Sequence, residues 1–62
     1  MIENIKELRI EIKNTIKSLE YKIKHTKSEI KIKMYYEMIE YLEDKIMEID
    51  YIIWKEDKQI YD

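Results

Sequence analysis

The sequence of 62 residues contains no glycine, no proline and no cysteine. The tight turns of a β-sheet protein usually depend on glycine or proline, so a sheet is disfavoured. An α-helix needs neither residue, and most of the residue types present favour one. We therefore expect an all-α protein that forms a single domain over residues 1–62. The lack of cysteine also excludes disulfides and thiol chemistry, and it fits a cytoplasmic protein.

Long hydrophobic runs are missing as well. The longest one, residues 51–54, is far shorter than the roughly 20 apolar residues of a membrane-spanning helix. Charged residues interrupt the N-terminal region, which therefore lacks the apolar stretch of a signal peptide. We expect neither insertion into a membrane nor secretion by a signal peptide.

Two apolar stripes with the alternating three-and-four spacing of a heptad repeat run along the chain. The first stripe consists of Ile2, Ile5, Ile12, Ile16, Leu19, Ile23 and Ile30. The second stripe consists of Tyr35, Ile39, Leu42, Ile46, Ile49, Ile53 and Ile60. Arg9 and Thr26 fill the two gaps in the first stripe, and Glu56 interrupts the second. The stripes are out of phase, because a continued first stripe would reach Glu37 where the second has Ile39.

Such a change of phase indicates either a turn between two helices or a stutter in one long helix. Residues 26–29 match the S/T-x-x-E capping box, in which Thr26 would accept a hydrogen bond from the Glu29 amide and Glu29 would reach back. We therefore predict an antiparallel hairpin with helices over about residues 3–24 and 27–60 and a turn near residues 24–28. Because no glycine is available to end the first helix, Lys24 or His25 would have to adopt the left-handed conformation.

Two alternatives to the hairpin remain open. One continuous helix of about 90 Å would form a coiled coil, at 1.5 Å per residue. A short strand would fit residues 28–34, where polar and apolar residues alternate with a period of two.

The small size of the chain predicts self-association. A single core in a protein below about 70–80 residues rarely supplies more than about 3–5 kcal/mol of stability. A lone hairpin also leaves one side of its apolar stripes in water, and a second copy would cover it. We expect a homo-oligomer, specifically a homodimeric four-helix bundle.

The second half of the chain is more apolar than one neighbouring helix requires. At 100° per residue, a strip separate from the seam is formed by Tyr36, Met47, Trp54 and Tyr61. Met34 and Tyr41 lie on the other flank and widen the seam toward a third helix. The separate strip would meet either a second copy or another protein, because Tyr and Trp are frequent binding hot spots and Met adapts to irregular surfaces.

The same region is strongly acidic. Residues 34–62 carry a formal charge of −6, against −1 for residues 1–12. This region contains an acidic ridge, which either is a solvated helix face or docks on a basic partner. The ridge consists of Glu37, Glu40, Glu43, Asp44, Glu48 and Asp50. The candidate protein-binding residues are Tyr36, Met47, Trp54, Tyr61, Glu40, Glu43 and Asp50.

Residues 13–33 carry a formal charge of +5. One interpretation is that Lys13, Lys17 and Lys24 face acidic side chains of the second helix and fix the antiparallel register. The other is a phosphate-binding tip made of Lys22, Lys24, Lys27, Lys31 and Lys33. Because this segment contains no arginine, any nucleic-acid binding would be weak, sensitive to salt and independent of base sequence.

The residues needed for catalysis are sparse. His25 is the only histidine, and a metal ion bound by His25 and Glu29 would lack further ligands. Without glycine there is no phosphate-binding loop, and a slim hairpin offers its carboxylates no deep cleft. We expect no enzymatic activity, no cofactor and no metal ion.

These observations favour a non-enzymatic protein–protein interaction module, such as an adaptor, a regulator or an inhibitor of a larger protein. The alternatives are an auxiliary nucleic-acid-binding protein that uses residues 22–33 and, if the helix is continuous, a coiled-coil spacer. Membrane-surface binding is disfavoured, because an acidic helix is repelled by anionic lipid. By association alone, this composition is typical of small proteins from AT-rich bacteria, plasmids and phages.

Overall fold

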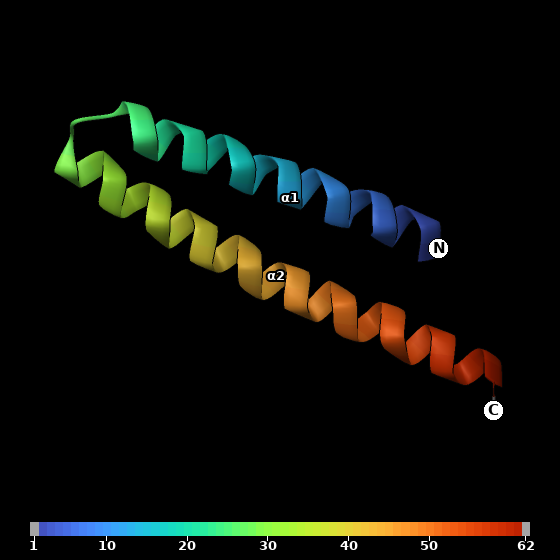
Figure 1. Cartoon of the computed structure of the whole chain (residues 1–62). Helices are drawn as coiled ribbons and strands as arrows, with labels where there is room; N and C mark the ends of the chain where they lie inside the picture. The colour runs from blue at the N-terminus through green and yellow to red at the C-terminus, as the bar shows by residue number, and fades with distance from the viewer. Residues whose placement is uncertain (1, 62) are drawn as a thin grey trace.

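The computed structural model describes the backbone of residues 2–61 and the side chains of residues 3–56. It contains two helices, α1 (Ile2–His25) and α2 (Glu29–Tyr61), which pack antiparallel as a hairpin (Figure 1). The predicted all-α class and the predicted hairpin are therefore confirmed. The continuous helix is wrong, because the chain turns at residues 26–28. The strand over residues 28–34 is also wrong, because this segment opens α2.

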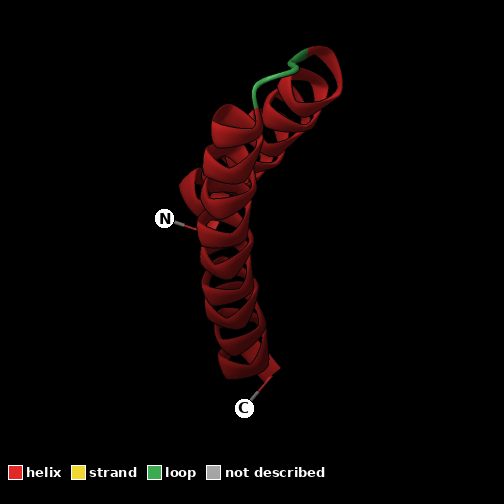
Figure 2. Cartoon of the chain, turned by 90° about the vertical axis from the view of Figure 1, so that its left-hand side faces the viewer, coloured by secondary structure: helices red, strands yellow, loops and turns green. Residues whose placement is uncertain are grey.

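The hairpin is long and thin, with principal extents of 52 × 15 × 13 Å. Both chain ends lie on the side away from the turn, and α2 extends beyond the first residues of α1 (Figures 1 and 2). The reason is the difference in length, since α1 has 24 residues and α2 has 33. In the part of the chain that the structure describes, neither helix has an apolar stretch long enough to cross a membrane.

One row of side chains from each helix forms the seam between them. The row from α1 and the turn contains Ile5, Arg9, Ile12, Ile16, Leu19, Ile23 and Thr26. The row from α2 contains Ile32, Tyr35, Ile39, Leu42, Ile46, Ile49 and Ile53. Leu19, Ile39 and Ile49 are the buried hydrophobic residues among the described side chains, and the others in both rows are half-buried. The predicted stripes are thus confirmed over most of their length.

Ile30 is the exception within the described side chains. It was predicted to close the first stripe, but its side chain is 75% exposed. The turn at residues 26–28 ends the periodicity of α1, and α2 begins a new one in which Ile32 occupies the seam. Glu56 is exposed, as expected of the polar interruption, whereas the side chains of Ile2 and Ile60 lie outside the described residues.

Ser28 is the residue that starts α2. Its hydroxyl oxygen accepts a hydrogen bond from the Lys31 N–H at 3.3 Å, and its carbonyl oxygen accepts the helical bond from the Ile32 N–H at 3.0 Å. This is the geometry of an N-cap residue. The Thr26 hydroxyl oxygen accepts a hydrogen bond from the Ser28 N–H at 3.3 Å, within the turn itself. The predicted capping box is therefore wrong, because Glu29 is already the first helical residue.

The end of α1 also differs from the prediction. No described residue has a positive φ angle, so neither Lys24 nor His25 adopts the left-handed conformation. The last turn of α1 carries Lys22, Lys24 and His25, and positive charge there complements the helix dipole. The rings of Tyr21 and His25 lie 4.2 Å apart between centroids, which packs this last turn locally.

Candidate protein-binding faces

An ion pair crosses the seam toward the open end of the hairpin. Arg9 Nε donates a hydrogen bond to Asp50 Oδ1 at 2.6 Å, and both side chains are partly exposed. Arg9 thus occupies one of the two gaps in the apolar stripe of α1, and its charged side chain pairs with Asp50 on α2. Asp50, which was predicted to contact a partner protein, is engaged within the chain.

The three lysines that were predicted to fix the antiparallel register do not form the expected ion pairs with the described side chains of α2. No ion pair joins Lys13, Lys17 or Lys24 to a described acidic side chain. Instead these lysines line a shallow groove along one flank of the hairpin. The register contact seen in the described part of the molecule is the one between Arg9 and Asp50.

The groove runs between the helices and has two parts, of about 510 Å³ and about 290 Å³. The larger part is lined by Lys13, Ile16, Lys17, Glu20, Ile39, Glu43, Ile46 and Met47. The smaller part is lined by Glu20, Ile23, Lys24, Tyr36, Ile39 and Glu43. The floor of the groove is therefore apolar and its α1 rim is mainly basic. Its α2 rim carries three of the predicted binding residues, Tyr36, Glu43 and Met47.

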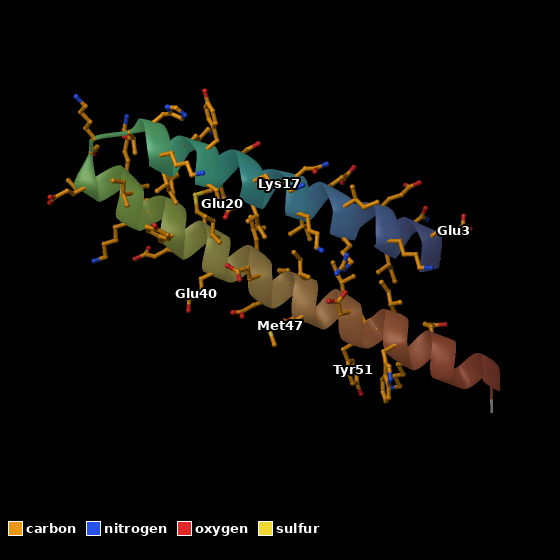
Figure 3. All side chains as sticks on the ribbon, viewed as in Figure 1. Glu3, Lys17, Glu20, Glu40, Met47 and Tyr51 are labelled. Atoms are coloured by element: carbon orange, nitrogen blue, oxygen red, sulfur yellow. The ribbon has the colours of Figure 1, made fainter. Side chains whose placement is uncertain are left out.

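We call the α2 side of this flank the aromatic face, defined by Tyr36, Glu40, Glu43, Met47 and Trp54. Its apolar side chains are largely exposed: 59% for Tyr36, 68% for Met47 and 55% for Trp54. Glu40 and Glu43 are exposed as well. Figure 3 shows Glu40 and Met47 extending from α2 away from α1, while Glu20 extends toward α2. The structure thus places five of the seven predicted protein-binding residues on one surface.

Tyr51 belongs to this surface but was not among the residues predicted from the sequence. Its ring lies 6.0 Å from the Trp54 ring between centroids, and its side chain is exposed (Figure 3). By helical projection Tyr51 points outward, and only its i,i+3 spacing from Trp54 signals the contact. The side chain of Tyr61, the last residue of the predicted strip, lies outside the described residues.

A second apolar surface lies on the opposite flank of α2. We call it the methionine face, and it consists of Met34, Met38, Tyr41 and Ile52 of α2 with Leu8 of α1, all exposed. At 100° per residue, the two faces of α2 lie roughly 180° apart, one on each side of the seam. Lys45 borders the methionine face, with its Nζ 5.2 Å from the centroid of the Tyr41 ring and 3.4 Å from Glu48 Oε2.

The lysine cluster surrounds the tip of the hairpin. Its five members, Lys22, Lys24, Lys27, Lys31 and Lys33, are exposed. None of them forms an ion pair with a described acidic side chain. The structure therefore brings the predicted phosphate-binding residues together at one end, on the last turn of α1, the connecting turn and the first turns of α2.

The described side chains include no group of three or more His, Cys, Asp or Glu residues that could hold a metal ion. No protein-family model, no curated protein and no solved structure matches the chain. Two separate groups of exposed hydrophobic and aromatic side chains on so small a molecule indicate an interaction interface.

Proposed function

We propose that this protein is a non-enzymatic interaction module of the cytoplasm that binds a larger protein through its aromatic face. The observation that carries the proposal is the exposure of Tyr36 and Met47 on the rim of an apolar groove. Both side chains lie outside the two rows that form the seam, so packing between α1 and α2 does not account for them. Binding of this kind suits an adaptor, a regulator or an inhibitor.

The chemistry of the aromatic face specifies the partner surface that would fit it. A partner side chain entering the groove would meet Ile16, Ile39 and Ile46, so it should be apolar. Glu40 and Glu43 lie on the α2 side of the groove and three lysines on the α1 side, so the partner should place basic residues beside the anchor toward α2 and acidic residues toward α1. Such an arrangement of an apolar centre and a charged rim is usual for specific protein interfaces.

The proposal is tested by recovering partners from the source cell with the full chain as bait. The informative variant is Tyr36→Ser/Met47→Ser, which removes two exposed apolar side chains from the aromatic face. The matched control is Tyr21→Ser/Ile30→Ser, which removes two exposed apolar side chains from the outer surfaces of α1 and α2. Circular dichroism establishes that each variant is as helical as the wild type.

Any protein recovered with the wild type is then purified and its affinity measured by calorimetry. We expect the wild type and the control variant to bind it alike, and the aromatic-face variant to bind at least about 30-fold more weakly, which corresponds to about 2 kcal/mol. Equal binding by the two variants, or recovery of no protein by the wild type, would contradict the proposal.

The tip lysines support a second candidate function, the binding of a nucleic-acid backbone. The supporting observation is their exposure together at one end without acidic partners among the described residues. Binding should then fall steeply between about 50 and 200 mM salt and disappear in Lys27→Glu/Lys31→Glu. Lack of binding to mixed-sequence DNA and RNA at about 50 mM salt removes this candidate.

Self-association completes the proposed function. A homodimer would give the small seam of the hairpin a larger core, as in a four-helix bundle.

A further inference from the structure

The hairpin exposes more surface than a folded monomer of its mass normally does. Its accessible area is 5535 Å², whereas the usual scaling with mass gives about 4,400 Å² for 7.8 kDa. The surplus of about 1,100 Å² matches what each chain buries in the smaller obligate homodimers, about 1,000 Å² or more. The surplus area of the whole molecule is therefore large enough to supply a dimer interface.

We propose that a second copy of the chain covers the methionine face, with α2 packed antiparallel on α2 of the partner copy. The two-fold axis passes between Met38 and Tyr41. The aromatic face stays on the outside of the dimer. This inference rests on the self-association included in the proposed function, and it does not depend on the identity of any larger partner.

The order of residues on the methionine face is self-complementary about that axis. In an antiparallel pair, residues equally far from the axis lie opposite one another. Met38 then meets Tyr41 of the other copy, in the favourable contact of a sulfur with an aromatic ring. Lys31 meets Glu48 of the other copy, so the charged ends of the contact attract.

A third pair in this register joins Met34 to Lys45, whereas Ile52 lies opposite residue 27, in the connecting turn of the other copy. The ammonium group of Lys45 is held by Glu48 and the Tyr41 ring within its own chain, which leaves its hydrocarbon stem for the contact. Thr15 faces the same flank from α1, and its hydroxyl group already donates a hydrogen bond to the Glu11 carbonyl oxygen at 3.0 Å. Burial of Thr15 at the dimer contact therefore leaves its hydroxyl group with a hydrogen-bond partner.

The aromatic face does not suit the same packing. In the antiparallel register that places Tyr36 opposite Met47, Glu40 of one copy lies opposite Glu43 of the other, so an α2–α2 contact on this face brings their carboxylates together. Like charges placed opposite one another at an interface cost affinity. The antiparallel arrangement on the methionine face also keeps the two lysine-rich tips, within the +5 segment of residues 13–33, at opposite ends of the dimer.

A dimer built in this way is bivalent. Each copy keeps its own aromatic face, and the two faces point outward on opposite sides of the four-helix assembly. Two partner molecules, or two sites on one partner, can then be engaged at once, which raises the apparent affinity without any new contact.

Methionine oxidation tests the proposal on the unmodified protein. Met34, Met38 and Met47 have similar exposure in the single hairpin, at 55%, 47% and 68%, so a monomer should oxidise at all three at similar rates. Trypsin cleaves after Lys33, Lys45 and Lys55, which separates Met34 and Met38 from Met47 in two peptides. The rate of sulfoxide formation by dilute hydrogen peroxide is followed by mass spectrometry from about 1 μM to 1 mM protein.

We expect Met38 to oxidise at least about fivefold more slowly than Met47 at high protein concentration, with the difference lost on dilution and in denaturant. Protection of Met47 instead, protection of both peptides, or protection of neither at any concentration would overturn the proposal. Each of these outcomes is decided on the wild-type chain, so no variant needs to fold.

A matched pair of variants provides the second measurement. Met38→Glu and Met47→Glu make the same change on the same helix, on opposite flanks. Light scattering should give twice the chain mass for Met47→Glu, and the mass of one chain or an unfolded chain for Met38→Glu. Dissociation of Met47→Glu with retention of a Met38→Glu dimer would assign the second copy to the aromatic face and contradict the inference.

Discussion

Arg9 on α1 and Asp50 on α2 are joined by a 2.6 Å hydrogen bond between Nε and Oδ1, across 41 residues of sequence. This contact sets the level at which the two helices lie side by side. It also explains why an arginine occupies a seam position that is otherwise filled by isoleucine and leucine.

We expect Arg9 and Asp50 to contribute a coupling free energy of about 0.2–1 kcal/mol, the usual range for a partly exposed ion pair. Urea unfolding of Arg9→Ala, Asp50→Ala and the double variant measures this quantity as a double-mutant cycle. The coupling should shrink in about 1 M salt, where exposed charges are screened. A coupling of zero at low salt would mean that the pair does not hold the register.

The N-cap of α2 predicts which of two alanine substitutions, at Ser28 or at Thr26, lowers the free energy of unfolding more. Ser28→Ala removes the oxygen that accepts the Lys31 N–H, and it should lower the free energy of unfolding by about 1 kcal/mol. Thr26→Ala should cost less, because the Thr26 oxygen serves only the N–H of Ser28 within the turn. Thermal or urea unfolding of both variants ranks them, and a larger loss for Thr26→Ala would restore the capping box and refute the assignment of Ser28.

The position of the seam predicts that two isoleucines on α2 contribute very differently to the stability of the protein. Ile39 is buried, so Ile39→Ala should destabilise the protein by about 2–4 kcal/mol, enough to unfold much of so small a molecule. Ile30 is exposed, so Ile30→Ala should change stability by less than about 0.5 kcal/mol. Circular dichroism at matched protein concentration measures both, and similar effects would show that the seam has been placed wrongly.

Periodicity in the sequence predicts most of the fold. The heptad spacing alone places Leu19, Ile39 and Ile49 in the seam, because burial of one face imposes that spacing on any packed helix. Periodicity does not place the turn. Thr26 and Ser28 are both good capping residues, and which of them starts α2 depends on the path of the chain between the helices. The assignment of Ile30 to the first stripe was wrong for the same reason.

The surfaces are only partly predictable from the sequence. Helical projection groups Tyr36, Met47 and Trp54 correctly, because residues on one helix share a face at fixed spacing. It cannot find the groove beside them, since a groove needs side chains from both helices at a common level. It also misses the pairing of Asp50 with Arg9, because a contact across 41 residues leaves no mark in local sequence.

The single tryptophan reports on which face is occupied. Trp54 is 55% exposed on the aromatic face, so its fluorescence should shift to shorter wavelength when a partner binds there. The formation of the proposed dimer, by contrast, should leave the emission maximum unchanged between dilute and concentrated protein. A concentration-dependent shift in the isolated protein would place Trp54 in the contact between copies.

Self-association underlies the interpretation of the methionine face as an interface between copies of the chain. Sedimentation equilibrium of the wild-type chain over a range of concentrations measures it most directly. We expect a helical species at twice the chain mass of 7.8 kDa. A stable, fully helical species at 7.8 kDa at every concentration would contradict this interpretation.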